Sequence, residues 1–217
     1  MLKSVFKHLP TGLQDGLRQL RANFRHRVGS RRLRRFLREN HGWKIVIGTS
    51  GVFEPGWIPT DIEYLNLLND ADWRDYFSPG SVGAILAEHV WEHLTPEQGL
   101  HAAQTCHRYL QPGGRLRIAV PDGHHPDPTY LQQVMINGTG AGAHDHKVLY
   151  THESLSRMLQ QAGFTVTLLE YFDATGTFHF QEWNRADGMI HRSSRYDKRN
   201  AGGKRVYTSL IVDAVKP

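Results

Sequence analysis

Short apolar runs alternate with helical patterns from residue 44 onward, and this alternation constrains the fold more than any other feature of the chain. The runs that read as buried strands are residues 44–47, 57–60, 82–87, 115–120, 164–171 and 206–214. Helices are indicated over residues 70–77, 96–110 and 151–161, and Thr95 is expected to cap the second of them. Alternating strands and helices predict an α/β fold with a mostly parallel sheet.

Glycine and polar residues gather where the strand runs end. They are the turn of Gly48, Thr49, Ser50 and Gly51, then Asp61, the stretch from Glu88 to His93, and Asp122. Open α/β sheets bind ligands at the carboxyl ends of their strands. We therefore expect these turns to form a ligand site.

The order of motifs over residues 43–172 resembles that of small bacterial class I S-adenosylmethionine-dependent methyltransferases. The motifs are Glu88-His89-Val90-Trp91-Glu92-His93-Leu94, Leu110-Gln111-Pro112-Gly113-Gly114, Val120-Pro121-Asp122 and Tyr150-Thr151-His152-Glu153. A strand that ends in a Glu-His turn, followed by a helix and by "L-x-P-G-G", is typical of these enzymes. The resemblance does not include the first 40 residues.

This resemblance implies a Rossmann-like sheet of seven strands, mostly parallel with one antiparallel strand and with helices on both faces. It also implies S-adenosylmethionine as cofactor, and it assigns roles to individual residues. The turn of Gly48, Thr49, Ser50 and Gly51 would lie under the methionine part of the cofactor, and Asp61 would accept hydrogen bonds from the ribose hydroxyls. Asp72 and Trp73 would lie at the adenine, with Trp73 stacked on it. Glu88 would face the methyl-donor pocket. One departure is that the first turn has only two glycines and leaves little room for the usual helix before Asp61.

Histidines are frequent, 14 in all, and several fall near the expected pocket. A histidine there could act as a general base, because its pKa lies near neutral pH. His89, Glu92, His93 and His146 could instead converge on a metal ion, or Glu92 and His93 could only fix the turn by hydrogen bonds. We assign His89, Asp122 and His146 as catalytic candidates and assign no metal ligand. Cys106 lies on the apolar side of its helix and is expected in the core.

The N-terminal segment differs in charge from the rest of the chain. Residues 1–38 hold eleven basic side chains and one acidic one, whereas the remainder holds 15 basic and 20 acidic ones. We therefore expect a basic helical arm over residues 1–40 and a methyltransferase domain over residues 41–217. Apolar residues at helical spacing define one face of the arm, namely Leu13, Leu17, Leu20, Phe24 and Val28.

Gly29 is expected to interrupt the helix of the arm, with Ser30 beginning a second one. A basic amphipathic helix can lie on an anionic membrane, pack on its own domain or, less favoured here, contact nucleic acid. The single cysteine and the lack of a long apolar run predict a cytoplasmic protein, with peripheral contact at the inner membrane through residues 1–38.

Methyl transfer to a hydroxyl of a small molecule, a glycan or a lipid-linked sugar is the function that we expect. A basic arm that tracks phosphates would also suit an RNA methyltransferase. The two-glycine turn leaves a third hypothesis, a non-catalytic Rossmann-like binding module.

Overall fold

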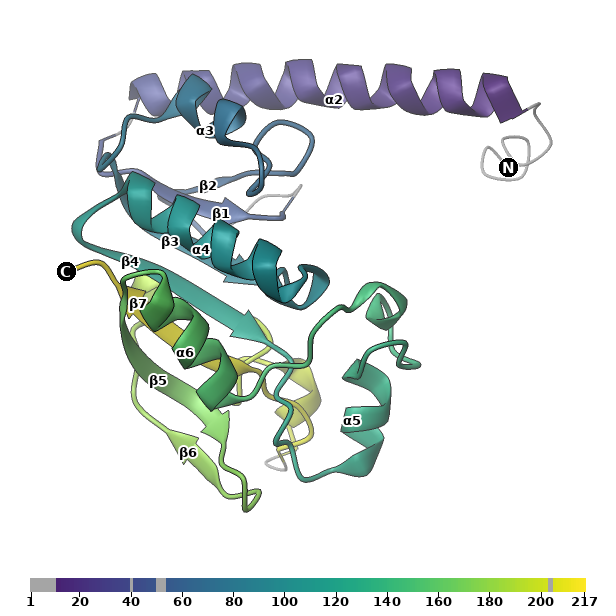
Figure 1. Ribbon diagram of the computed structural model, residues 1–217, viewed down its shortest axis with the longest axis vertical. Helices are drawn as coiled ribbons and strands as arrows, with labels where there is room; N and C mark the ends of the chain where they lie inside the picture. The colour runs from purple at the N-terminus through teal and green to yellow at the C-terminus, as the bar shows by residue number, and fades with distance from the viewer. Residues whose placement is uncertain (1–10, 40, 50–53, 203–204) are drawn as a thin grey trace.

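Seven strands form one sheet at the centre of the computed structural model, in the order β2-β1-β3-β4-β7-β5-β6 (Figure 1). The structure describes residues 11–39, 41–49, 54–202 and 205–217. The strands are β1 (Lys44–Ile47), β2 (Trp57–Pro59), β3 (Val82–Glu88), β4 (Leu110–Val120), β5 (Thr165–Phe172), β6 (Phe178–Phe180) and β7 (Leu210–Val215). β1, β2, β3 and β5 lie within one residue of the runs expected from the sequence. β4 begins at Leu110 where 115 was expected, β7 begins at Leu210 where 206 was expected, and β6 was not expected.

Five of the strands run in one direction. β1 pairs in parallel with β2 and β3, and β3 pairs in parallel with β4. β7 lies antiparallel between β4 and β5, so β5 runs with the parallel set, and β6 is antiparallel to β5. The mostly parallel seven-stranded sheet is thus confirmed, but it contains two antiparallel strands where one was expected.

The α-helices that pack on the sheet share one of its faces. They are α2 (Thr11–Glu39), α3 (Asp70–Tyr76), α4 (Pro96–Tyr109) and α6 (His152–Gln161), and they enclose the main core. Capping boxes at Thr95 and Thr151 begin α4 and α6. The cap at Thr95 was expected, whereas Thr151 was expected to be the first residue of its helix. Cys106 is buried in this core as expected. The short helix α5 (Pro128–Val134) packs instead with Tyr207 near the end of the sheet.

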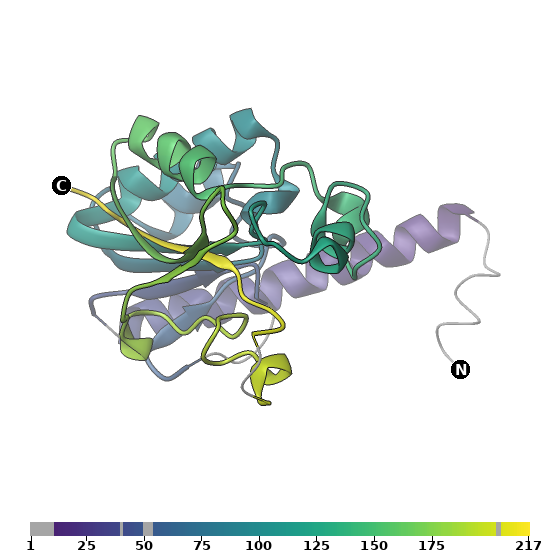
Figure 2. The same cartoon turned by 90° about the horizontal axis from the view of Figure 1, so that it is seen from below.

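An irregular segment covers the opposite face. We call residues 181–209 the cover segment; it is described except for residues 203 and 204, and its helical parts are the 3-10 turns Arg185–Asp187 and Lys198–Asn200 (Figure 2). Trp183 and Ile190 of this segment pack on Val46, Leu86 and Ile211 of the sheet. The expectation of helices on both faces is therefore corrected, because among the described residues only 3-10 turns stand where α-helices were expected.

Helix α2 is continuous through Gly29, so the expected break there is corrected. An added Cβ at Gly29 would lie 2.2 Å from the Tyr64 ring, which means that glycine allows that ring to approach the helix backbone closely. Ser30 does not cap a helix but accepts a hydrogen bond from Tyr76 at 2.7 Å. Leu33 is only 1% exposed in the main core. The packing therefore divides α2 itself: its second half belongs to the core, and its first half projects beyond the body (Figures 1 and 2).

A buried ion pair holds the cover segment to the sheet. Arg117 of β4 and Asp213 of β7 lie opposite each other, and two hydrogen bonds of 2.7 and 2.8 Å join them. Arg117 is 1% exposed, and it also donates to the carbonyls of Gly188 and Asn184 in the cover segment. The pair thus satisfies two charges and fixes the turn at residues 184–188 to the sheet.

We expect Asp213→Asn to lower the free energy of unfolding by about 3–5 kcal/mol, because it leaves the guanidinium of Arg117 buried without its counter-charge. Urea denaturation measures this. Glu182→Gln, which removes an exposed partner of Arg195, serves as the matched control and should change stability little. Equal effects of the two substitutions would show that the buried pair does not anchor the fold.

Candidate active site

The turn after β3 brings His89 to the carboxyl edge of the sheet in a strained backbone conformation. Its φ is +57°, a left-handed value that residues with a side chain seldom adopt. The backbone N–H of His89 donates to the carbonyl of Ala119 at 2.8 Å, which fixes the turn against β4. Strain held in this way is common where a side chain must be aimed at a ligand.

The imidazole of His89 lies between two polar partners. Its Nδ1 is 2.8 Å from Oε1 of Glu92, and its Nε2 is 3.0 Å from the hydroxyl oxygen of Ser209. Glu92 is only 1% exposed, and an ionised carboxylate can only accept hydrogen bonds. It therefore favours the tautomer with the proton on Nδ1. The hydroxyl of Ser209 also lies 2.8 Å from the carbonyl of Arg192, so Nε2 accepts from this hydroxyl only when the hydroxyl turns away from that carbonyl.

Two cavities meet at His89, and the first lies at the ends of β1 and β3. It has a volume of about 370 Å³. Its wall is mostly apolar and comprises Ile47, Gly48, Ile62, Leu65, Asn66, Leu67, Leu68, His89, Val90, His93, Leu94 and Asp145. This is where the sequence predicts the cofactor.

Gly48 is the member of the predicted glycine turn that lines this cavity. Its φ is +74°, and an added Cβ would lie 3.0 Å from Val90 Cγ2, so both the conformation and the space favour glycine. Thr49 donates its backbone N–H to the carbonyl of Thr60 and so ties the turn to the end of β2. The predicted residues Ser50 and Gly51 lie outside the described part of the chain.

Asp61 follows β2 beside Ile62 of the cavity wall. Burial, together with a hydrogen bond to and repulsion from Glu63, raises the pKa of Asp61 to about 6. Glu63 in turn accepts a hydrogen bond of 2.7 Å from Arg25 of α2. A carboxylate whose charge is disfavoured in this way is stabilised by any ligand that donates hydrogen bonds to it, as ribose hydroxyls do.

Three predicted cofactor residues serve the scaffold instead. Trp73 is fully buried and stacked on Tyr109 with ring centroids 5.1 Å apart, so the expected stacking on adenine is corrected. Asp72 accepts from the backbone N–H of Asn66 and the side chain of Asn69, and so shapes the loop that forms the cavity wall. Glu88 accepts from the backbone N–H groups of the cover segment at residues 191 and 192, and does not line either cavity.

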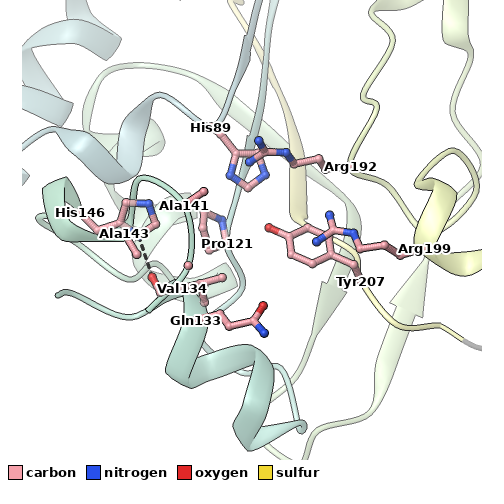
Figure 3. Close-up of a pocket in the computed structure, with 11 residues that line it drawn as sticks. His89, Pro121, Gln133, Val134, Ala141, Ala143, His146, Arg192, Arg199 and Tyr207 are labelled. Atoms are coloured by element: carbon pink, nitrogen blue, oxygen red, sulfur yellow. Dashed lines mark hydrogen bonds between the residues drawn. The ribbon is translucent and has the colours of Figure 1, made fainter. Parts of the chain in front are cut away.

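The second cavity has a volume of about 340 Å³ and opens on the other side of His89 (Figure 3). It is lined by His89, Pro121, Gln133, Val134, Gly140, Ala141, Ala143, His146, Arg192, Arg199 and Tyr207. The predicted residue His146 is here, and its Nδ1 lies 2.7 Å from the carbonyl of Val134. That carbonyl can only accept, so the Nε2 of His146 keeps its lone pair.

Asp122 does not reach either cavity, which corrects its assignment as a catalytic candidate. It is 0% exposed, and its carboxylate accepts from the backbone N–H groups of Phe172 and His124 at 2.7 and 2.9 Å. Burial raises its pKa. Asp122 thus joins the end of β4 to β5.

Sequence reasoning missed the residues that the cover segment contributes to the second cavity. Arg192, Arg199 and Tyr207 come from a stretch without regular periodicity, beyond the part of the chain that carries the resemblance. The one available signal was the concentration of arginine and histidine around residues 191–199.

Some of the histidines are placed where they could hold a metal ion. Ligand atoms of Glu92, His93 and His146 lie within 4.8 Å of one another. A second such group is His124, His152 and Glu153. The first set also fits a network of charged and polar contacts around His89, and we assign no metal to either.

Comparison with known proteins identifies the family. Residues 31–169 match a family model described as "Methyltransferase domain", and the chain belongs to this family. This confirms the expected enzyme class, a methyltransferase, and S-adenosylmethionine is the cofactor that we expect for it. No curated protein matches the chain.

Solved structures of low identity are similar to the chain. One is an S-adenosylmethionine-dependent methyltransferase from Archaeoglobus fulgidus, with 16% identity over 88% of this chain and 94% of that one and a TM-score of 0.43. Another, from Mesorhizobium loti, has 14% identity over 85% and 95% and a TM-score of 0.47. The apo form of the methyltransferase SibL has 17% identity over 76% of this chain and a TM-score of 0.44, and this chain spans 37% of its length.

The first cavity fits the cofactor of this class. Gly48 would let the cofactor lie close to the backbone, and the apolar wall from Leu65 to Leu68 would contact its base. Asp61 does not itself line the cavity; it directly precedes Ile62 of the wall and would accept from a ribose placed beside it. The cofactor supplies a methyl group activated by a sulfonium.

We expect S-adenosylhomocysteine to bind more tightly as the pH rises from 5 to 7.5, because ribose hydroxyls donate to the ionised form of Asp61, whose pKa is about 6. The stability of the ligand-free protein should change in the opposite direction. Because the pKa of Asp61 is raised in the folded state, the free energy of unfolding should fall as pH rises from about 4 to about 6. Calorimetric titration across this range measures the affinity. Asp61→Asn should bind more weakly and lose most of the pH dependence; an unchanged pH profile would contradict the assignment.

Proposed function

We propose that the chain transfers a methyl group from S-adenosylmethionine to a hydroxyl of a small molecule, a glycan or a lipid-linked sugar. The observation that carries this proposal is that His89 lines both cavities. A cofactor in the first cavity and an acceptor in the second would meet at its ring. The volume of the second cavity, about 340 Å³, suits a small acceptor or one sugar unit.

The reaction needs alignment and the removal of one proton. The cofactor would supply the methyl group and leave as the thioether, and Nε2 of His89 would take the hydroxyl proton as the acceptor oxygen is methylated. The carboxylate of Glu92, 2.8 Å from Nδ1, stabilises the imidazolium that results. His146, on the opposite side of the second cavity, offers its free Nε2 to a second polar group of the acceptor.

Substitution of His89 separates this proposal from a binding module. We expect His89→Gln to lower the rate of methyl transfer by about 10²–10⁴-fold, the usual contribution of a general base, and to leave affinity for S-adenosylhomocysteine nearly unchanged. The assay follows labelled methyl from S-adenosylmethionine into hydroxyl-bearing acceptors, beside matched deoxy compounds as controls.

Other outcomes of this assay would overturn the proposal. Label on an amine or on a deoxy control would exclude hydroxyl transfer, and a full rate in His89→Gln would exclude His89 as base. Label in RNA would favour the alternative of an RNA methyltransferase. Binding without transfer to any acceptor would favour the non-catalytic module.

We also propose that the first half of α2 attaches the enzyme to an anionic membrane surface. Its apolar face is exposed, with Leu20 66% and Phe24 69% accessible. Phe24 and Leu33 are nine residues apart, about two and a half turns, so the apolar face points away from the side that packs in the core. Arginines 31, 35 and 38 continue the outward side, and no described helix is long and apolar enough to cross a bilayer.

The apolar face favours a lipid surface over nucleic acid, because phosphate tracking needs charge but no apolar side chains. We expect the full chain to sediment with vesicles that contain an anionic lipid and not with neutral ones. Leu20→Gln combined with Phe24→Gln should abolish sedimentation and leave S-adenosylhomocysteine binding intact, since neither residue packs in the core. Retained sedimentation in this variant, or salt-sensitive RNA binding in place of lipid binding, would refute the proposal.

A further inference from the structure

We propose that the acceptor carries an oxyanion, a phosphate or a carboxylate, and that Arg192 and Arg199 bind it in the second cavity. The inference rests on the proposed function, because it names a chemical property of the acceptor in the same site. It follows from the charge of the cavity wall, from the pairing of the arginines in the cover segment, and from how the two guanidinium groups are held.

The wall of the second cavity contains basic side chains and no acidic ones. Arg192, Arg199, His89 and His146 line it, and the remaining lining residues are uncharged. Figure 3 shows Arg192 and Arg199 entering from the same side, opposite His146. A concave site with two guanidinium groups and no carboxylate on its wall attracts anions.

Arg192 differs from Arg185, Arg195 and Arg199 of the cover segment, and Arg205 lies over the ring of Phe178 outside the second cavity. Arg185 pairs with Glu54 at 2.6 Å, Arg195 with Glu182 at 2.9 Å, and Arg199 with Asp197 at 2.6 Å. Within the described part of the chain, the guanidinium of Arg192 has no carboxylate within ion-pair distance and no hydrogen-bond acceptor. A charged fork that faces a cavity without a partner can take both oxygens of a phosphate or carboxylate.

The main chain of Arg192 is fixed. Its N–H donates to Glu88 at 2.7 Å, and its carbonyl accepts from the hydroxyl of Ser209 at 2.8 Å and from the backbone N–H of Ser209 at 3.0 Å. Ser209 is also the partner of Nε2 of His89. The hydroxyl of Ser209 donates to the carbonyl of Arg192 or to Nε2 of His89, one at a time, and so lies between the backbone of Arg192 and the proposed base. An anion on Arg192 would lie near the reacting oxygen.

Arg199 is held by two contacts that leave part of its guanidinium available. Asp197 takes Nε and Nη2 at 2.8 and 2.6 Å, and the group lies 3.5 Å from the centre of the Tyr207 ring. Nη1 makes no bond to Asp197 and can donate to a ligand. Because Asp197 neutralises Arg199, the uncompensated positive charge of the pair is that of Arg192, which makes Arg192 the residue to substitute.

Inorganic phosphate and acetate are the probes. The full chain, saturated with S-adenosylhomocysteine, is titrated with each anion at constant ionic strength, and chemical shifts of the ¹⁵N-labelled protein give the dissociation constants. We expect shifts in the second cavity, and Arg192→Gln should weaken the tighter anion about tenfold or more, because a charge-assisted hydrogen bond contributes on that order. The anion affinity of Arg192→Lys should lie between that of the unsubstituted protein and that of Arg192→Gln, since lysine keeps the charge but not the forked guanidinium.

The control is Arg195→Gln, three residues along the same segment, where the arginine is exposed, paired with Glu182 and absent from the cavity wall. It should bind both anions as the unsubstituted protein does. The tighter of the two anions identifies the group as phosphate or carboxylate.

Two results would overturn the inference: no shift in the second cavity with either anion, or equal affinity in Arg192→Gln. Failure of this inference remains distinct from failure of the proposed function. Normal S-adenosylhomocysteine binding and hydroxyl methylation without an anion effect refute only the subsite. Anion binding that persists when no acceptor is methylated refutes only the reaction.

Discussion

The buried pair of Arg117 and Asp213 is the interaction on which the position of the cover segment depends. It lies between neighbouring strands and reaches the turn at residues 184–188, so it secures a segment that has no α-helix in its described part to pack with. Two further carboxylates act in the same way: Glu88 holds the backbone at residues 191 and 192, and Glu170 accepts from Trp183, Ser194 and Thr208. Irregular backbone must satisfy its N–H groups locally, and strand side chains do this here. The cover segment can therefore present Arg192, Arg199 and Tyr207 from a fixed position.

The turn at residues 88–93 connects this cover with the cofactor side. Glu88 points to the cover segment, His89 lies between the two cavities, and Glu92 is buried behind His89. The left-handed backbone of His89 separates the directions of these neighbouring side chains, and the hydrogen bond to Ala119 maintains it. This one short turn thus positions the cover segment, the proposed base His89 and the carboxylate of Glu92. The end of a single strand therefore determines much of the site.

Local pattern predicted most of the fold, because each strand or helix carries its own signal. β1 has the predicted bounds, and the cap at Thr95 begins α4 as expected. Burial was harder to foresee. Asp122 and Trp73 stand where a ligand was expected, yet tertiary contacts enclose both, with backbone amides at the carboxylate and Tyr109 on the indole. The cover segment was not predictable from periodicity, because its position depends on buried polar contacts between residues far apart in the sequence, such as Glu88 with Arg192.

Helix α2 shows why the charge of a segment does not define its structural role. From charge alone, residues 1–40 form a separate arm, but the helix contributes Leu33 to the core and Arg25 to Glu63, which shares a hydrogen bond with Asp61. Arg25 favours the ionised form of Glu63, and Glu63 in turn disfavours the ionised form of Asp61 at the edge of the cofactor cavity. Removal of the whole arm would therefore disturb the core, the cofactor edge and any surface attachment together. The exposed apolar face, in contrast, contacts none of these groups, so substitutions on it isolate attachment from catalysis. The division that matters for function lies between the two faces of one helix and not at a point along the chain.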